Sequence, residues 1–271
     1  MRPERALRQA VKATAAALDR VRRPAPGVVV LCYHRVGGGS GLELDLHVDT
    51  FAAQMAEVAD RAVPLPVALD HLRDASAPPG PHPVVVTFDD GTADFVDRAL
   101  PVLAQYRVPA TVYVATAHVD EGEPFAYGAP PASWGGLRDA AATGLVTVAS
   151  HTHRHRLLDR LPAPDVHDEL DRSIELIGER IGAAPLDFAY PKAVRPSPVA
   201  DQAVRARFRS AALAGTRANR PGATDPFLLA RSPIQASDGM AWFRCKLAGG
   251  LALEDGLRDV LNRRRYAGAV R

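Results

Sequence analysis

The stretch that organises this chain reads Val84-Val85-Val86-Thr87-Phe88-Asp89-Asp90-Gly91. Its apolar, β-branched half predicts a buried strand that ends in two adjacent carboxylates and a glycine. Because the carboxyl ends of strands in α/β proteins carry the active site, we expect Asp89 and Asp90 at a site. Gly91 lets the chain curl there, so one carboxylate can hold a metal while the other accepts a proton. The structural alternative is that Asp90 or Thr92 caps a helix over 94–106.

Composition and charge narrow the class of protein. The 271 residues allow one sizeable core, and the formal charge of +2 gives no electrostatic footprint for nucleic acid as a partner. The two cysteines, Cys32 and Cys245, form no disulfide framework, and Cys32 lies in an apolar run typical of a buried thiol. No stretch approaches the roughly 20 apolar residues of a membrane helix.

The N-terminal residues 1–26 are predicted to form a helical extension to a single catalytic domain over residues 27–271. Lys12 interrupts the only apolar segment and arginines follow it, so no secretory signal is legible. The pattern is that of an amphipathic helix, with Leu7, Val11 and Leu18 near one face. Such a helix either packs on the domain or makes a peripheral membrane contact.

Strands and helices alternate along the rest of the chain. Predicted strands cover about 28–33, 84–88, 110–115, 145–149, 187–190, 211–214 and 228–230, and predicted helices about 51–58, 67–73, 94–106, 134–142, 164–181, 199–208, 241–247 and 253–263. This alternation predicts parallel strands with helices outside, in a barrel or an open doubly wound sheet. In both, strand ends gather at one face, where these residues would meet: His34, Asp89-Asp90, His151 to His155 and Tyr190-Pro191.

Two phosphate-handling motifs match the sequence poorly. The glycine-rich run at 37–41 lacks the GxGxxG spacing and the Gly-Lys-Ser/Thr of a phosphate loop, so no nucleotide site is expected. The acidic stretch also differs from the Asp-x-Asp-Gly-Thr motif of haloacid-dehalogenase phosphatases. Phe88 stands where that motif has its nucleophilic aspartate.

A second motif suggests a metal site. His151 and His155 are four residues apart, so both imidazoles can point the same way, as two metal ligands require. With one carboxylate they form a two-histidine, one-carboxylate set suited to Zn²⁺ or another divalent first-row ion, and the other carboxylate would be the base on a bound water. The alternative is a solvated histidine-rich loop, since His153 and His167 lie in the same region.

These motifs together resemble those of a known family. The runs at 87–91 and 151–155 are similar to the first two motifs of the polysaccharide deacetylases, carbohydrate esterase family 4, or nodulation-type deacetylase domain. The resemblance extends from about Val28 to Ile234. Further segments resemble the subgroup of the biofilm poly-N-acetylglucosamine deacetylases: Tyr33-His34-Arg35-Val36, Ala99-Leu100-Pro101-Val102-Leu103 and Pro109-Ala110-Thr111-Val112-Tyr113-Val114.

The resemblance implies a distorted (β/α)7 barrel, here with an N-terminal helical extension and C-terminal helices. It also implies metal-dependent removal of acetyl groups from N-acetylated sugars. By the family pattern Asp89 is the general base, while Asp90, His151 and His155 hold the metal, expected to be Zn²⁺ with Co²⁺ or Ni²⁺ as alternatives. In the subgroup a histidine near the N-terminus replaces the usual general acid, and the matching residue is His34.

The third motif departs from the family pattern and reads Phe188-Ala189-Tyr190-Pro191-Lys192-Ala193. It lacks the arginine that orients the base in other members, and Lys192 replaces an aromatic residue whose backbone N–H helps stabilise the oxyanion. A backbone donor survives any change of side chain, so Tyr190, Pro191 and Lys192 are expected at the oxyanion and substrate site. The lysine side chain would face an anionic substrate or stay solvated. No Leu-x-His follows near the C-terminus, where Arg231-Ser232-Pro233-Ile234 stands, so acid catalysis depends on His34.

The function expected from the sequence is therefore that of a metal-dependent carbohydrate N-deacetylase. Its substrate would be an acetylated oligo- or polysaccharide or a lipid-linked glycan, with Tyr127, Trp134 and Trp242 as candidates for stacking on sugar rings or for packing. The alternatives are an O-acetyl carbohydrate esterase and a catalytically weak glycan-binding member of the same fold. Because no export signal is legible, we expect a cytoplasmic or inner-membrane-associated location.

Overall fold

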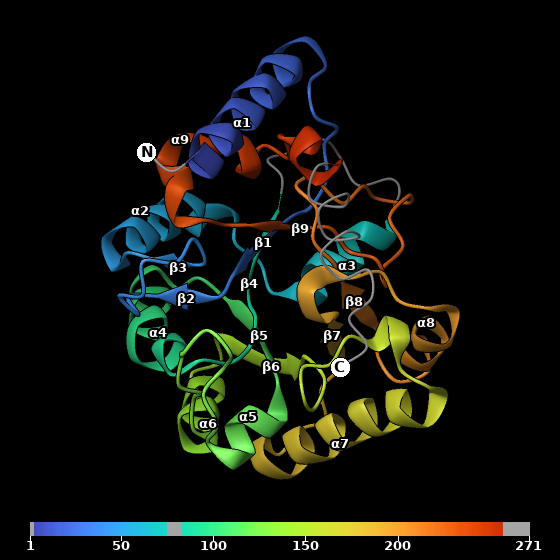
Figure 1. Ribbon diagram of the computed structural model, residues 1–271. Helices are drawn as coiled ribbons and strands as arrows, with labels where there is room; N and C mark the ends of the chain where they lie inside the picture. Colours follow the sequence, from blue (N-terminus) through green and yellow to red (C-terminus); the bar gives the residue numbers. More distant parts are fainter. Residues whose placement is uncertain (1–2, 75–82, 257–271) are drawn as a thin grey trace.

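Seven parallel strands form the centre of the computed structural model, which describes residues 3–74 and 83–256 (Figure 1). Their order is β8-β7-β6-β5-β4-β1-β9, and all neighbours in this sheet pair in parallel. The strands are β1 (Val29–Tyr33), β4 (Val84–Phe88), β5 (Ala110–Val114), β6 (Val146–Ser150), β7 (Asp187–Ala189), β8 (Ser210–Ala212) and β9 (Arg231–Pro233). The carboxyl ends of β1, β4, β6 and β7 therefore lie at one end of the sheet, as the sequence predicts.

The sheet curls into a nearly closed barrel, because the chain around β8 meets the chain leading into β9. The Leu229 N–H donates to the Ala211 carbonyl (3.0 Å), and the Leu213 N–H donates to the Leu229 carbonyl (2.8 Å). A third bond runs from the Gly215 N–H to the Arg231 carbonyl (2.8 Å). The predicted distorted (β/α)7 barrel is confirmed, and the open sheet is wrong. The strand predicted at 228–230 is shifted, since 229 only bridges to β8 while β9 proper begins at Arg231.

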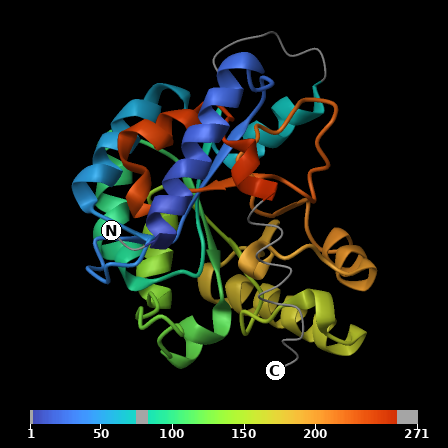
Figure 2. The ribbon, with the colours of Figure 1, turned by 45° about the horizontal axis from the view of Figure 1, so that its top comes forward.

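Helices surround the barrel (Figures 1 and 2). They are α1 (Pro3–Val21), α2 (Val48–Val58), α3 (Leu65–Arg73), α4 (Leu100–Tyr106), α5 (Thr116–Glu121), α6 (Trp134–Ala142), α7 (Ala163–Ile181), α8 (Pro198–Arg205) and α9 (Gly239–Leu247). The helix predicted over 94–106 is a π-helical segment, Phe95–Ala99, continued by α4. Of the helix predicted at 253–263, the part beyond residue 256 lies outside the described residues.

An aromatic cluster anchors the end of β4. The Phe88 ring, directly before Asp89, stacks on Tyr33 at 5.4 Å between centroids and meets Phe51 and Phe95 edge-on at 5.7 Å and 4.9 Å. Such ring pairs add stabilisation beyond the area they bury. Packing of the Phe88 ring in the core thereby holds the strand end that carries Asp89 and Asp90 in place.

Helix α1 is joined to the barrel by a buried ion pair. The Lys12 ammonium is fully buried and lies 2.5 Å from one carboxylate oxygen of Asp238, whose other oxygen accepts from Lys246 at 2.8 Å. The Trp242 indole on α9 donates to Gln9 of α1, which runs beside it in both views (Figures 1 and 2). Among the described residues, no helix combines the length and apolarity needed to cross a bilayer.

We predict that Lys12→Ala lowers the free energy of unfolding by about 3 kcal/mol, the low end for breaking a buried ion pair, because Lys246 still neutralises Asp238. Urea denaturation followed by circular dichroism measures the change. Arg8→Ala, at an exposed position of α1, serves as the control and should stay within about 0.5 kcal/mol of wild type. Equal effects from the two substitutions would contradict the prediction.

Candidate active site

Strand β4 delivers two carboxylates to the carboxyl end of the barrel with different backbone conformations. The Asp89 N–H donates to the Tyr33 carbonyl (3.0 Å) and continues the pairing with β1. Asp90 and Gly91 then turn into the left-handed region, with φ of 73° and 85°. A Cβ at Gly91 would lie 3.2 Å from the Val114 methyls, so glycine suits this turn in both space and conformation. The turn sends the two buried side chains to separate partners.

Asp89 is held by an arginine from the far end of the chain. Arg231, which is 2% exposed, donates from Nη1 and Nη2 to the two carboxylate oxygens at 2.5 Å and 2.9 Å, and from Nε to the Leu213 carbonyl at 3.2 Å. Burial alone would raise the pKa of Asp89, but the guanidinium charge and its paired hydrogen bonds outweigh burial and hold that pKa well below its usual range. Asp89 is therefore a carboxylate at neutral pH.

The structure corrects the expectation that no arginine orients this carboxylate. The third motif lacks the orienting arginine, but Arg231 of β9 takes that role. In the sequence, this position was notable only because no Leu-x-His motif stands there. A signal was present: Arg231 is a lone charge next to the apolar run at 228–230, and a charge in a buried strand needs a partner. The identity of that partner was not legible.

Asp90 faces the two predicted histidines. The Nε2 atoms of His151 and His155 lie 3.7 Å and 3.4 Å from its Oδ1, and one ligand atom from each of the three residues lies within 4.8 Å of the others. Oδ1 is buried and has no hydrogen-bond partner within the described part of the chain. Asp90, His151 and His155 are thus brought together as the sequence predicts, around an oxygen that lacks a partner.

The imidazole rings of His151 and His155 are in the neutral form that binding to a metal requires. Burial lowers the pKa of His151 and lowers that of His155 to about 3, so each ring is neutral. The His151 Nδ1 lies 2.8 Å from the Ala189 carbonyl, to which it must donate, and this leaves Nε2 with a free lone pair toward Asp90. One carboxylate and two neutral histidines are a donor set that Zn²⁺ and similar divalent ions accept.

Tyr127 completes the surroundings of Asp90. Its hydroxyl, in the loop between α5 and α6, donates to Asp90 Oδ2 at 2.5 Å, which leaves Oδ1 as the oxygen open to a metal. The sequence suggested sugar stacking for this ring and not a bond to the carboxylate. The other two aromatic candidates are bonded elsewhere, Trp134 to Asp120 and Trp242 to Gln9.

His34 follows β1 and lies beside the other carboxylate. A ring nitrogen of His34, the Cys32 sulfur and an Asp89 oxygen lie within 4.8 Å of one another. This group differs from the Asp90 group because the Arg231 guanidinium already occupies both Asp89 oxygens. A second cation would face that charge, so a metal fits the Asp90 group better.

The third motif lies at the same end of the barrel, after β7. The Tyr190 ring packs edge-on against Phe188 at 5.1 Å and belongs to the hydrophobic cluster under α8, so its side chain contributes packing. Lys192 is exposed with φ of 54°, and its charge helps to lower the pKa of His155. Within the described residues its backbone N–H forms no hydrogen bond, whereas the Ala193 N–H donates to the Tyr190 carbonyl.

Comparison with protein families identifies this arrangement. Residues 76–211, half of the chain and the part that contains both predicted motifs, match the family model described as polysaccharide deacetylase. The chain belongs to the polysaccharide deacetylase family. The family named by the motifs is therefore confirmed. No curated protein matches the chain.

Solved structures agree with this assignment. The deacetylase is 28% identical to IcaB from Ammonifex degensii, with a TM-score of 0.71 over 83% of this chain and 98% of that one, which agrees with the subgroup suggested by the motifs. Two others show the fold at 21% identity. They are the Streptococcus pyogenes deacetylase PplD (TM-score 0.67, 79% and 94% covered) and the de-N-acetylase from Aggregatibacter actinomycetemcomitans (0.66, 80% and 99%).

We predict that Tyr127→Phe weakens the affinity of the deacetylase for Zn²⁺ or Co²⁺ by about 10-fold or more, because partners of ligating carboxylates typically contribute 10- to 100-fold. Without the hydroxyl, Asp90 loses its only side-chain hydrogen bond among the described residues and can rotate. Competition with a chromophoric chelator gives the dissociation constant. Tyr106→Phe on α4 is the matched control, and equal affinities of the two variants would refute the role of Tyr127.

Proposed function

We propose that this deacetylase is a metal-dependent hydrolase that removes acetyl groups from N-acetylated sugars of a glycan or glycoconjugate. One observation carries the proposal: Asp89, which Arg231 keeps ionised, lies beside a group of side chains that can bind a metal. Asp89 Oδ2 is 3.9 Å from the Nε2 of His151, which in turn is 3.7 Å from Asp90 Oδ1. A general base at Asp89 and a metal held by the Asp90 group would thus be neighbours, as hydrolysis by an activated water requires.

Asp90, His151 and His155 would hold the cation, with Zn²⁺ expected and Co²⁺ or Ni²⁺ as alternatives. When bound, such a cation acidifies a water and polarises the acetyl carbonyl. The three side chains supply one negative charge and two neutral nitrogens, and the Tyr127 bond and the Ala189 carbonyl orient two of them.

Asp89 would take the proton from the attacking water. Arg231 keeps the carboxylate ionised and holds it in one plane, because both oxygens are bonded to one rigid guanidinium. A carboxylate of such low pKa is a weak base, so it accepts a proton only from an acidified donor. Its position beside the Asp90 group would place Asp89 next to such a donor.

The two remaining roles belong to His34 and the third motif. His34 lies beside Asp89 and would protonate the leaving amine. The free N–H of Lys192 would donate to the oxyanion into which the acetyl carbonyl oxygen is converted when water attacks. Tyr190 and Pro191 place that N–H at the end of β7 and would not contribute side-chain chemistry.

The substrate class and setting are part of the same proposal. An acetylated oligo- or polysaccharide or a lipid-linked glycan would be the substrate, met in the cytoplasm or at the inner membrane. Peripheral membrane contact through α1 would use its exposed end, where Leu18 and Val21 face solvent. The two alternative functions are cleavage of O-acetyl esters and glycan binding without turnover, and measurements of acetate release distinguish them.

Replacement of three residues should separate their roles in acetate release from matched N- and O-acetylated oligosaccharides. Asp89→Asn should lower turnover by about 10²- to 10⁴-fold while bound metal is retained. Asp90→Ala should lose the metal and the activity together. His34→Ala should lower amide cleavage more than ester cleavage, because an amine must be protonated to leave whereas an alkoxide leaves more readily.

Asp97→Asn, an exposed carboxylate on the π-helical segment, is the control and should behave as wild type. Wild-type acetate release from the Asp90 variant would exclude the metal assignment. Release from O-acetyl substrates with none from N-acetyl substrates by the wild-type enzyme would favour the esterase. Bound metal without release from any substrate would favour a binding protein.

Substitution of Arg231 should shift the pH dependence of kcat/KM. In Arg231→Met burial acts on Asp89 without the opposing charge, so the pKa of Asp89 rises and the acid limb of the profile moves to higher pH. Arg231→Lys keeps the charge and should shift the limb less. Arg209→Met is the control, because Arg209 forms a similar two-point bond with the buried Asp187 away from the site. An unshifted acid limb in Arg231→Met would contradict the prediction.

A further inference from the structure

The loop that follows β6 carries both histidines in a strained conformation. Thr152 and His155 have φ of 69° and 57°, although neither is glycine. Each residue held in this region costs about 1–3 kcal/mol and persists only where its surroundings enforce it. The residues that hold this loop therefore decide whether His155 can meet Asp90.

One side of the loop is held by main-chain bonds from the start of α5. The Thr116 N–H donates to the Thr152 carbonyl at 3.3 Å, and the Ala117 N–H donates to the His153 carbonyl at 2.8 Å. These bonds fix the loop carbonyls. They leave the loop amides to be satisfied from the other side.

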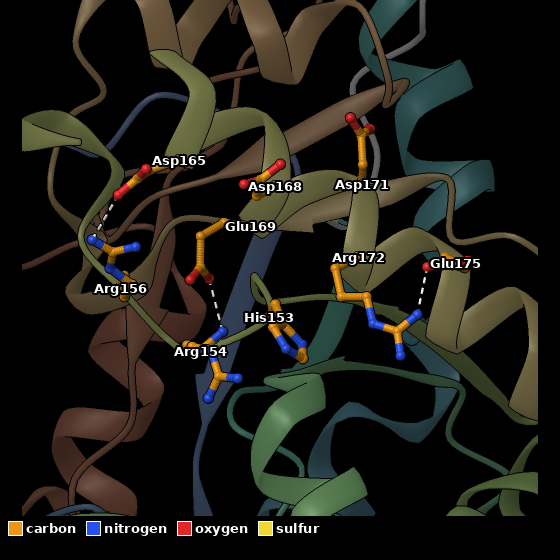
Figure 3. Close-up of a pocket in the computed structure, with 9 residues that line it drawn as sticks. All are labelled: His153, Arg154, Arg156, Asp165, Asp168, Glu169, Asp171, Arg172 and Glu175. Atoms are coloured by element: carbon orange, nitrogen blue, oxygen red, sulfur yellow. Dashed lines mark hydrogen bonds and ion pairs between the residues drawn. The ribbon is translucent and has the colours of Figure 1, made fainter. Parts of the chain in front are cut away.

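The other side is held by side chains of α7. The Arg154 N–H donates to Glu169 Oε2 at 2.7 Å, and Ser173, one turn further along α7, bonds through its hydroxyl to Ser150 at 2.6 Å. One face of this 19-residue helix thus contacts both the end of β6 and the middle of the loop. Figure 3 shows the Glu169 carboxylate turned toward the Arg154 amide.

Glu169 differs from its acidic neighbours in the same cavity, which has a volume of about 800 Å³. Asp165 and Glu175 pair with the arginine side chains of Arg156 and Arg172 (Figure 3). Glu169 is only 4% exposed and is bonded to the loop backbone instead. A buried carboxylate is costly unless it is bonded, and a bond from N–H to a charged acceptor is about twice as strong as a neutral one. The carboxylate and the loop amide therefore stabilise each other.

The two histidines depend on this contact unequally. His151 is anchored independently, by its N–H to the Val114 carbonyl at 3.0 Å and by its ring to the Ala189 carbonyl. His155 lies directly after Arg154, beyond these anchors, and adopts the left-handed conformation itself. Loss of the Glu169 bond would release His155 and spare His151.

We propose that Glu169 is a positioning residue whose carboxylate holds the 151–155 loop so that His155 reaches Asp90, and that it thereby sets the affinity of the site for a divalent metal. The inference rests on the proposed function in taking Asp90, His151 and His155 as metal ligands. Glu169 itself touches neither metal nor substrate.

The test is Co²⁺ binding to the full chain, measured by chelator competition and by the visible absorption of the bound ion. Glu169→Ala should raise the dissociation constant by about 10- to 100-fold and weaken the absorption bands, because one ligand is lost. Glu169→Gln keeps an oxygen acceptor for the Arg154 N–H and should stay within a few-fold of wild type. Glu175→Ala, an exposed residue of α7 that lines the same cavity, is the matched control.

A double-variant cycle shows whether the effect acts through His155. In a His155→Ala background, Glu169→Ala should cause no further loss of Co²⁺ affinity. Thermal unfolding of the metal-free variants identifies any that do not fold. If Glu169→Ala is one of them, Glu169→Asp, whose carboxylate is one methylene further from the Arg154 N–H, takes its place in the comparison with Glu175→Ala and should still bind Co²⁺ more weakly.

Three results would overturn the inference. Co²⁺ affinity of a folded Glu169→Ala equal to that of Glu175→Ala would show that the carboxylate does not position the loop for metal. Additive losses in the double variant would show that it does not act through His155. If wild type binds no Co²⁺ or Zn²⁺, the proposed function fails first, and the inference falls with it.

Discussion

The ion pair between Asp89 and Arg231 is the interaction on which barrel and site both depend. Arg231 accepts a backbone bond from Gly215 where the two ends of the sheet meet, and its side chain enters the barrel to neutralise Asp89. A carboxylate buried without that cation would be protonated or would destabilise the core. One residue therefore closes the barrel and keeps a carboxylate charged inside it.

The rest of the site is arranged by a strand that contributes no catalytic side chain. The end of β5 lies between β4 and β6, where the Ala115 N–H donates to the Asp90 carbonyl at 3.1 Å and the Val114 carbonyl accepts from the His151 N–H at 3.0 Å. The backbones of Asp90 and His151 are thus both held by hydrogen bonds to adjacent residues at the end of one strand. Among Asp90, His151 and His155, only His155 lies on a loop away from this strand, and contacts with α7 hold that loop in place. The order of the carboxyl ends across the sheet explains how Asp90 and His151, about 60 positions apart, come within 3.7 Å of each other.

The sequence predicted the features that depend on a local pattern of residues, and it missed those that depend on pairing between distant residues. The alternation of strands and helices, the acidic pair and the histidine spacing each depend on a few adjacent residues, and the structure bears out the barrel and the meeting of Asp90 with His151 and His155. Arg231 could not be matched to Asp89 because 142 residues separate them, and β9 is too short for periodicity to locate. Tyr127 was seen only as an aromatic in a loop, since no periodicity indicates where a loop hydroxyl will point.

The long separation of Asp89 from Arg231 has a consequence for the order in which the protein is made. Synthesis proceeds from the N-terminus, so the strands from β1 to β8 have been made before the arginine exists, and domains in general begin to fold as they emerge. Until β9 joins the sheet, Asp89 lacks its guanidinium partner, so this carboxyl group either stays hydrated or takes up a proton. The charged form of Asp89 inside the barrel therefore depends on a late event in synthesis, and a nascent or truncated chain that ends before residue 231 lacks the guanidinium that keeps this carboxylate ionised.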